Sequence, residues 1–426
     1  MSTSASRRRG PASRPDAAAR VLYLSYDGMC DPLGASQVLP YLTGLAARGH
    51  RISLTSFEKR ERTAAERAAV HRTCDEAGIA WHPLPYHKWP PILSTMFDIW
   101  RMRRLALALH RECRFDLAHC RSYLPALVGL RLKRRKGVRF LFDMRGFWAD
   151  ERVEGGIWNL ANPAIRAVFN FFKRREAQFL REANHIVSLT EAGRQILIER
   201  RSGKDGPPIT VIPCCADFAA FPAVDAAKRA SARNLLGIPA DATVVGYLGS
   251  FGSWYMVREM FAFFRVQLDR DAAAIFLIVS REPAAEIRAA AQAHGVPADR
   301  VVVRPASRAD VPRLMAASDY GLFFIQPVFS KKASSPTKMG ELLALELPIV
   351  TNGGVGDVSK IMAETGAGVV VEHFDGNAYR QALDNLARMK PDIEKWRSAA
   401  RHWFDLETGI ERYDAIYREL ANHRAA

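Results

Sequence analysis

The sequence has little that would suit a membrane-spanning or disulfide-stabilised protein. None of its apolar runs approaches the roughly 20 residues that a transmembrane helix needs. Its six cysteines include no Cys-x-x-Cys pair and no histidine partner at zinc spacing, which argues against a disulfide framework or structural zinc. Free thiols in a reducing cytoplasm are therefore expected. Residues 1–19 lack the apolar core of a secretory signal, and their Ser-, Ala- and Arg-rich composition predicts a disordered basic arm.

Acidic residues are scarce relative to basic ones. The chain has 61 Lys and Arg against 45 Asp and Glu, a formal net charge of +16. This excess favours an anionic partner, which the composition leaves open as nucleic acid, an acidic bilayer surface or a phosphorylated substrate. The basic residues concentrate in the first half of the chain, in clusters at 101–104, 111–114, 131–136 and 173–175. A solvated face explains any single cluster, but it explains their concentration in one half less well.

The length of 426 residues is too great for one ordinary core and predicts two domains of about 150–200 residues each. Short apolar runs alternate with helical patterns in two successive blocks, separated by a Pro/Ala-rich connector at 221–236. This rhythm predicts the α/β class, with two doubly wound, Rossmann-like domains that face a central cleft. The expected strands are 21–25, 51–57, 116–120, 138–142, 185–189, 209–213, 243–248, 274–279, 301–303, 320–325, 348–351 and 368–371. The expected helices include 37–48 and 410–420.

Three loops begin at or near the ends of expected strands. They are residues 28–37 in the first block, and 249–254 and 334–341 in the second. Ligands of open α/β sheets bind at the carboxyl ends of the strands, so these distant loops are expected to meet at the cleft. Glycine at Gly34 would let the backbone approach a ligand closely, and the helix after it could direct amides at phosphate, although an ordinary turn explains the glycine equally well.

The most informative loop has the sequence Ser-Ser-Pro-Thr-Lys (334–338) and leads into a helix that contains Glu341. Hydroxyls just ahead of a helix can cap its amides, and those amides suit an anion such as phosphate. Lys338 adds a positive charge, and Glu341, one turn later, could accept hydrogen bonds from a ribose diol. Together they suggest a nucleoside-diphosphate pocket. The alternative is a capped amphipathic helix with a Lys–Glu pair on its surface.

With its neighbours in the chain, this loop resembles the donor-site signature of retaining, family-4 type nucleotide-sugar glycosyltransferases with the GT-B fold. The resemblance covers most of the chain from Val21 onward. It also rests on the glycine loop at 25–41, on Asp-Leu-Ala-His at 116–119 and on Phe-Asp-Met-Arg-Gly-Phe-Trp at 142–148. It implies an arm at 1–19, an N-terminal acceptor-side domain at 20–220, a C-terminal donor domain at 221–405 and a helix at 406–426 that crosses back to the first domain.

The resemblance and the residue chemistry together define a candidate site. Lys338 and Arg145 are the expected catalytic residues. The guanidinium of Arg145 could hold a phosphate or the donor sugar, or pair structurally with Asp143. His119 and Asp143 are expected on the acceptor side, although His119 also suits a core histidine at a strand end. The expected donor-binding residues are Gly34, Gln37, Ser250, Trp254, Ser334, Ser335, Thr337, Lys338 and Glu341.

The sequence departs from the family pattern in two places. Relatives commonly have two glutamates eight positions apart, and Ala333 stands where the first would be, eight residues before Glu341. The usual Arg and Lys after the first donor-domain strand are absent from the loop at 249–255. Neutralisation of a diphosphate would then depend on Lys338, aided by Lys331 or Lys332.

The resemblance implies a hexosyltransferase that moves a sugar from a nucleoside-diphosphate sugar to an acceptor, with retention of configuration and no cofactor. No metal is expected, because Asp269 and Asp271 suit a solvated turn. The basic first half, with Trp89, Trp100 and the 101–104 cluster, suggests a peripheral position on an anionic inner membrane and a polyprenol-linked glycan acceptor in polysaccharide biosynthesis. Two alternatives are a nucleotide-sugar epimerase of similar architecture and a non-catalytic module that binds a nucleotide or nucleic acid. Nucleic acid is disfavoured because no recognised nucleic-acid module is present.

Overall fold

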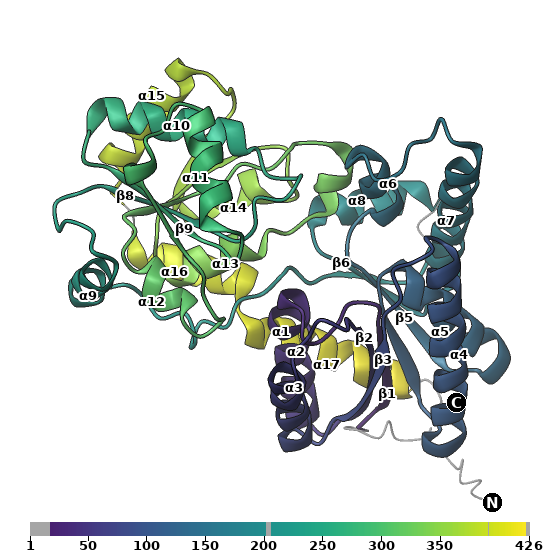
Figure 1. The fold of residues 1–426 in the computed structure, drawn as a ribbon. Helices are drawn as coiled ribbons and strands as arrows, with labels where there is room; N and C mark the ends of the chain where they lie inside the picture. The colour runs from purple at the N-terminus through teal and green to yellow at the C-terminus, as the bar shows by residue number, and fades with distance from the viewer. Residues whose placement is uncertain (1–17, 202–205, 391, 423–426) are drawn as a thin grey trace, which may run out of the picture.

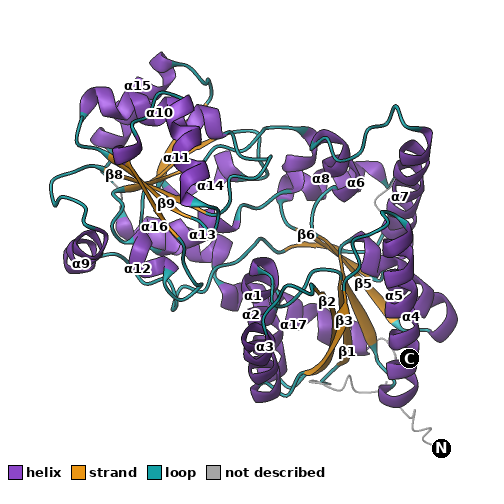
Figure 2. Cartoon of the chain, viewed as in Figure 1, coloured by secondary structure: helices purple, strands orange, loops and turns teal. Residues whose placement is uncertain are grey.

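The computed structural model describes residues 18–201, 206–390 and 392–422, which form two α/β domains (Figures 1 and 2). Each domain is built around one sheet of parallel strands with helices on both faces. The predicted fold class of two doubly wound, Rossmann-like domains is confirmed. The predicted basic arm at 1–19 lies almost wholly outside the described residues.

The first domain contains a seven-stranded sheet in the order β3-β2-β1-β4-β5-β6-β7. Its strands are β1 (Arg20–Ser25), β2 (Arg51–Glu58), β3 (Ala80–Pro85), β4 (Leu117–Arg121), β5 (Arg139–Met144), β6 (His185–Ser188) and β7 (Ile209–Val211). The strand order reverses between β1 and β4, which places the ligand crevice of such a sheet at their carboxyl ends. Strand β3 is absent from the predicted strands because Pro83 and Pro85 lack amide donors. Proline is tolerated on an edge strand, which is where β3 lies.

The second domain contains a six-stranded sheet in the order β10-β9-β8-β11-β12-β13. Its strands are β8 (Val244–Leu248), β9 (Ile275–Val279), β10 (Val301–Arg304), β11 (Tyr320–Leu322), β12 (Ile349–Asn352) and β13 (Gly368–Val371). Here the order reverses between β8 and β11. The central strands β8 and β9 are buried along their whole length, as parallel strands covered by helices on both faces should be.

The helices of the first domain depart from the sequence expectation at one point. They are α1 (Pro32–Gln37), α2 (Leu39–Ala47), α3 (Ala64–Glu76), α4 (Leu93–Cys113), α5 (Tyr123–Lys136), α6 (Trp148–Glu154), α7 (Pro163–Glu182) and α8 (Glu191–Arg200). The single helix expected at 37–48 is instead two helices that start at Pro32 and break at Val38. Pro40 has no amide to continue the α1 ladder, and this accounts for the break.

The helices of the second domain include one that replaces an expected connector. They are α9 (Ala226–Leu236), α10 (Val257–Arg270), α11 (Ala284–Ala293), α12 (Val311–Met315), α13 (Thr337–Ala344), α14 (Val358–Thr365), α15 (Gly376–Arg388) and α16 (Ile393–Phe404), with 3₁₀ helices η1 (Ala298–Arg300) and η2 (Phe329–Ala333). The expectation of a connector across 221–236 is wrong for its second part. Asp225 caps α9 through the amide of Lys228, and Gly237 ends the helix in the left-handed conformation.

The chain passes between the domains twice, and the two passages lie side by side. Ala216 N donates to Phe404 O at 2.8 Å, and Leu406 N donates to Ala216 O at 3.1 Å. The last helix, α17 (Leu406–Asn422), then packs against α2 and β4 of the first domain (Figure 1). Its buried side chains Ile410, Tyr413, Ile416, Tyr417 and Leu420 join that domain's core. Among the described residues, no helix is both long enough and apolar enough to cross a bilayer.

Candidate active site

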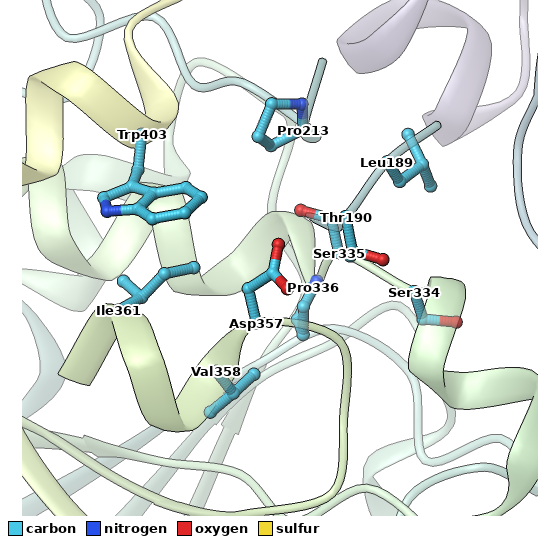
Figure 3. Close-up of a pocket in the computed structure, with 10 residues that line it drawn as sticks. All are labelled: Leu189, Thr190, Pro213, Ser334, Ser335, Pro336, Asp357, Val358, Ile361 and Trp403. Atoms are coloured by element: carbon cyan, nitrogen blue, oxygen red, sulfur yellow. The ribbon is translucent and has the colours of Figure 1, made fainter. Parts of the chain in front are cut away.

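The candidate site lies where the start of α13 meets the connector that follows β7. The Cys214 amide of this connector donates to Ser335 Oγ at 3.1 Å. Residues of both domains line a small pocket beside this contact (Figure 3): Leu189, Thr190, Pro213, Ser334, Ser335, Pro336, Asp357, Val358, Ile361 and Trp403. The predicted residues Ser334 and Ser335 therefore lie at the boundary between the two domains.

The start of α13 differs from the sequence expectation. The helix begins at Thr337 with Pro336 in the capping position, and no side chain caps it. The expectation that the Ser and Thr hydroxyls cap this helix is therefore wrong, because Ser335 instead accepts a hydrogen bond from the other domain. The uncapped end keeps its positive partial charge available to an anion.

Lys338 points into an aromatic enclosure. Its Nζ lies 4.0 Å from the ring centre of Tyr247 and 3.7 Å from that of Tyr255. Gly249, at the end of β8, closes another side, because a Cβ placed there would lie 3.3 Å from Nζ. Burial lowers the pKa of Lys338 well below its ordinary value, and Glu341 opposes that shift. The ammonium is buried and has no hydrogen-bond acceptor in the described parts of the chain.

Glu341 lies one turn further along α13 and is also buried. Its carboxylate pairs with Arg308, whose guanidinium stacks 4.7 Å above the ring of Phe221. Burial raises the pKa of Glu341, while Arg308 and then Lys338 pull it down. The sequence gives no signal for Arg308, because it stands in a loop 33 residues away and matches no motif. Burial outweighs these two cations, so the pKa of Glu341 is raised overall, and in either form its oxygens can accept hydrogen bonds from ribose hydroxyls.

Arg145, Asp143 and His119 form one group around the middle of β4 and the carboxyl end of β5, in which Asp143 and His119 are buried and Arg145 is mostly buried. Asp143 Oδ1 lies 3.5 Å from Arg145 Nη1, and Asp143 Oδ2 lies 3.2 Å from His119 Nε2. His119 Nδ1 is 2.7 Å from the hydroxyl of Tyr417 in α17. Burial alone would raise the pKa of Asp143, but Arg145 and His119 outweigh it and lower the pKa. His119, bonded on both ring nitrogens, is well placed to hold Asp143, and Arg145 extends from there to the sulfur of Cys214 at 3.4 Å.

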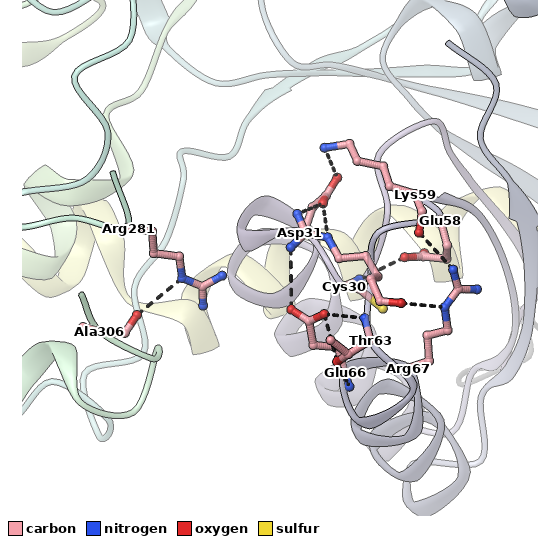
Figure 4. Close-up of polar contacts among 10 residues, drawn as sticks. Cys30, Asp31, Glu58, Lys59, Thr63, Glu66, Arg67, Arg281 and Ala306 are labelled. Atoms are coloured by element: carbon pink, nitrogen blue, oxygen red, sulfur yellow. Dashed lines mark hydrogen bonds and ion pairs between the residues drawn. The ribbon is translucent and has the colours of Figure 1, made fainter. Parts of the chain in front are cut away.

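Amides of the glycine loop at the start of the first domain bind a carboxylate from the end of β2. Glu58 Oε1 accepts from the amide of Met29 at 2.7 Å. Glu58 Oε2 accepts from the amide of Cys30 at 3.2 Å (Figure 4). Gly34 packs against the loop itself, because a Cβ there would lie 2.1 Å from Gly28 O. At least two of the loop amides expected near a phosphate therefore already have a carboxylate partner.

Gln37 has a partner in the connector after β7, and Ser250 has one in its own loop. Gln37, at the end of α1, donates from Nε2 to Cys215 O at 3.0 Å and so ties the glycine loop to the connector. Ser250 is exposed, and its carbonyl accepts from the Tyr247 hydroxyl at 2.5 Å.

Trp254 lies at a contact between the domains. Its ring lies under Lys331 Nζ, 3.7 Å away, and against Gly155, where a Cβ would lie 2.6 Å from the ring. Lys331 itself donates to Glu151 of α6 at 2.6 Å. Trp254 and Lys331 thus join the second domain to α6. The charge of Lys331, expected to help neutralise a diphosphate, is paired with a carboxylate.

Ala333 occupies the position where relatives have a glutamate. It is buried against the first domain, where its Cβ lies 3.0 Å from the position of a Cβ built on Gly193 of α8. Nearby, Thr190 Oγ1 donates to Lys332 O at 2.7 Å. Asp357 accepts from the first two amides of α8, those of Glu191 and Ala192, at 2.7 and 3.0 Å. These contacts fasten η2 and the start of α14 to α8 of the first domain. The close packing against Gly193 explains why a small side chain stands at position 333.

Four of the predicted site residues hold a buried polar atom without a hydrogen bond in the described segments. These atoms are Gln37 Oε1, Asp143 Oδ1, Arg145 Nε and Lys338 Nζ. Buried polar atoms of native proteins are nearly all hydrogen-bonded. Each of these four atoms is therefore able to bond to a polar group of a ligand or to water. No group of three or more His, Cys, Asp and Glu side chains suited to a metal ion occurs among the described residues.

Two facing Rossmann-like domains with a back-crossing last helix define a GT-B protein, and comparison with known structures agrees. Sucrose-phosphate synthase from Thermosynechococcus elongatus superposes with a TM-score of 0.73 over 96% of this chain and 100% of that chain, at 17% identity. Alr3699/HepE from Anabaena, solved in complex with UDP-glucose, gives a TM-score of 0.66 over 93% and 98% of the two chains, at 14% identity. Similarity at these identities shows the fold.

The sequence comparisons point to one family. Residues 34–215 match the family model described as glycosyl transferase 4-like domain. A curated D-inositol 3-phosphate glycosyltransferase from Kineococcus radiotolerans is 31% identical over 144 residues, which span 34% of this chain and 31% of the relative. The predicted resemblance to family-4-type glycosyltransferases is thus supported by the domain match over residues 34–215 and by this relative, of which the matched segment spans about a third, while the structural neighbours show the GT-B fold.

Proposed function

We propose that the protein transfers a sugar from a nucleoside-diphosphate sugar, held mainly by the second domain, to an acceptor held by the first. The observation that carries this proposal is the buried ammonium of Lys338 at the uncapped start of α13. A phosphate oxygen would supply the acceptor that Nζ lacks. Alr3699/HepE, of the same fold, was solved with UDP-glucose, which supports a nucleotide-sugar donor here.

The reaction needs positive charge where the donor breaks. As the glycosidic bond cleaves, negative charge grows on the β-phosphate, and groups fixed around it stabilise the transition state. In this proposal Lys338 and the first amides of α13 approach the phosphate from the second domain, and Arg145 approaches from the first. These groups can balance the leaving diphosphate, so we propose that no metal or cofactor is required. Activity should then persist in excess EDTA.

We propose that configuration is retained through front-face attack by the acceptor hydroxyl, with the leaving phosphate taking the proton. The arrangement of Asp143 supports this assignment. Its carboxylate is held by Arg145 and His119, and His119 is held by Tyr417. A carboxylate with these partners and a lowered pKa is suited to orient Arg145 rather than to serve as a base.

Glu341 is proposed to bind the ribose hydroxyls. Thermal shift against UDP, GDP, ADP, CMP and dTDP tests this, with Glu341→Ala compared with Glu286→Ala, an exposed carboxylate on α11 of the same domain. One diphosphate should stabilise the wild type and the Glu286 variant but not the Glu341 variant. Loss of a pair of charge-assisted hydrogen bonds, about 3 kcal/mol, would weaken binding roughly a hundredfold. No shift with any nucleotide would overturn the donor assignment, and turnover of a nucleotide sugar without acceptor would indicate an epimerase.

The proposed acceptor is a polyprenol-linked glycan on an anionic membrane surface. The formal charge of +16 and its concentration in the first half of the chain support an anionic partner on the acceptor side. Product analysis with lipid-linked and free glycan acceptors tests this choice, because preference for a free acceptor would exclude the lipid carrier.

A further inference from the structure

The described part of the chain exposes ten large apolar side chains, and six of them fall between residues 89 and 100. They are Trp89 (80% exposed), Ile92 (39%), Leu93 (63%), Met96 (61%), Phe97 (47%) and Trp100 (47%). We refer to these six as the α4 platform. Single exposed apolar residues are ordinary on a protein surface, whereas a group of this size marks an interaction site.

The platform is a regular stripe on α4. Leu93, Met96, Phe97 and Trp100 are spaced at i, i+3, i+4 and i+7, which places them on one side of the helix. Ser94, Asp98 and Met102 occupy the opposite, buried side. In its first two turns α4 thus directs its apolar stripe outward, the reverse of an ordinary surface helix.

The buried side fixes this orientation. Asp98 is fully buried and accepts from the amide of His87 at 3.1 Å and from the hydroxyl of Tyr26 at 3.1 Å, and it lies 2.6 Å from His87 Nδ1. Rotation of the helix to hide the stripe would expose this network. The buried hydrogen bonds of Asp98 therefore hold the helix with its apolar stripe facing outward.

The turn into α4 carries backbone strain. Ile92 has φ 69° and ψ −57°, and the amide of Leu93 donates to Pro91 O at 2.8 Å. This is a γ-turn of the rare, strained kind, here at a β-branched residue. Strained residues of this type cluster at functional sites, which supports a functional role for the platform.

Charge around the platform has one sign. The guanidinium of Arg104 lies 4.9 Å from the ring centre of Trp100, and that of Arg101 lies 5.9 Å from that of Phe97. Lys88 is exposed just before Trp89. Between residues 86 and 111 the one acidic residue is Asp98, which is buried. Two copies of the chain joined through this surface would bring arginine against arginine, so the charge disfavours self-association and favours an anionic partner.

We propose that the α4 platform docks on an anionic lipid bilayer. Its aromatic and aliphatic side chains enter the boundary between headgroups and acyl chains, while Lys88, Arg101 and Arg104 contact lipid phosphates. This inference rests on the proposed function in one respect: a lipid-linked acceptor would give the enzyme a reason to bind a bilayer. Because Asp98 bonds to Tyr26 at the end of β1, docking would hold the crevice beside β1 at a fixed height above the bilayer.

Vesicle co-sedimentation of the full chain tests the proposal, using phosphatidylcholine alone or mixed with phosphatidylglycerol. The wild type should bind the anionic vesicles and lose binding at high salt. The double variant Leu93→Ser/Met96→Ser should lose roughly tenfold or more of its partitioning. Its matched control, Ile157→Ser/Leu235→Ser, changes two side chains of similar exposure outside the platform and should bind like the wild type.

A second pair of variants separates charge from apolar contact. Arg101→Gln/Arg104→Gln should lose several-fold in binding to anionic vesicles. Arg258→Gln, which changes the most exposed arginine among the ion pairs of the second domain, should not. Equal binding to neutral and anionic vesicles, no binding, or binding unaffected by the platform variants would overturn the proposal. So would a concentration-dependent dimer that Leu93→Ser/Met96→Ser abolishes. Nucleotide thermal shifts of the same variants report folding and the donor site separately, so the two proposals can fail independently.

Discussion

Replacing Lys338 with methionine should separate the stability of the protein from its activity. The buried ammonium has no hydrogen-bond acceptor in the described residues, which costs the fold about 1–3 kcal/mol or more. Its cation–π contacts with Tyr247 and Tyr255 offset up to about 2 kcal/mol of this cost. Methionine has a similar length and makes favourable sulfur–aromatic contacts. The free energy of unfolding without nucleotide should therefore be unchanged or rise by about 1 kcal/mol.

The free energy of unfolding should also depend on pH differently in the wild type and in Lys338→Met. The pKa of Lys338 is lowered by burial in the folded state, while the unfolded chain has the ordinary value of about 10.4. Between these two pKa values the unfolded state binds more protons, so the free energy of unfolding rises with pH across that window. The Lys338→Met variant should lack this rise.

Denaturant unfolding at a series of pH values, with and without the stabilising nucleotide, measures both effects. Lys395→Met, an exposed lysine on α16 of the same domain, is the control. In Lys338→Met, kcat/KM should fall about 10²–10³-fold, the usual loss on removing one preorganised charge-stabilising donor. A variant destabilised by several kcal/mol that still responds to nucleotide would refute the reasoning, because Lys338 would then be a structural residue.

Two further substitutions test the boundary between the domains and the buried charge group. Ala333→Glu should lower the free energy of unfolding by about 1–3 kcal/mol and reduce activity, because a carboxylate would be forced against Gly193, and an unchanged melting temperature would contradict the packing. Asp143→Asn should cost about 3–5 kcal/mol at neutral pH by leaving Arg145 buried without its carboxylate. The pKa of Asp143 is lowered in the folded state, so its carboxylate stabilises the fold fully above the ordinary pKa of about 3.9. This stabilisation is lost as the pH falls from that value through the lower, folded-state pKa. The free energies of unfolding of the wild type and of Asp143→Asn, measured over a series of acidic pH values, should therefore converge at low pH.

The fold could be predicted from the sequence because buried parallel strands are continuous apolar runs. Residues 274–279 and 320–325 are visible in this way, although the second strand stops at Leu322. Strand β3 could not be predicted, since Pro83 and Pro85 suit only an edge, and edge position is not visible in a local pattern. Helix α9 carries ordinary helix signals, an Asp225 cap, several alanines and Gly237 after its last turn, and only the prolines on either side made the segment resemble a connector.

Only those site residues that lie close together in the sequence could be predicted from it. Lys338 and Glu341 stand one turn apart after a recognisable loop, so their shared position could be predicted. Their partners could not: Arg308 reaches Glu341 from 33 residues away, and Glu151 reaches Lys331 from 180 residues away. No window of sequence reports such contacts, because they exist only once both domains are folded and facing each other.

The back-crossing helix has a consequence for biosynthesis. Tyr413 and Tyr417 of α17 pack in the core of the first domain, against His119 and Tyr41. The ribosome makes these tyrosines after the entire second domain, whose sheet and helices come from one continuous stretch of chain. The second domain can therefore fold as soon as it emerges, while the first waits with an open apolar surface until the last turns are synthesised. Nascent chains should need protection from aggregation over that interval, and the first half expressed alone should be its most chaperone-dependent fragment.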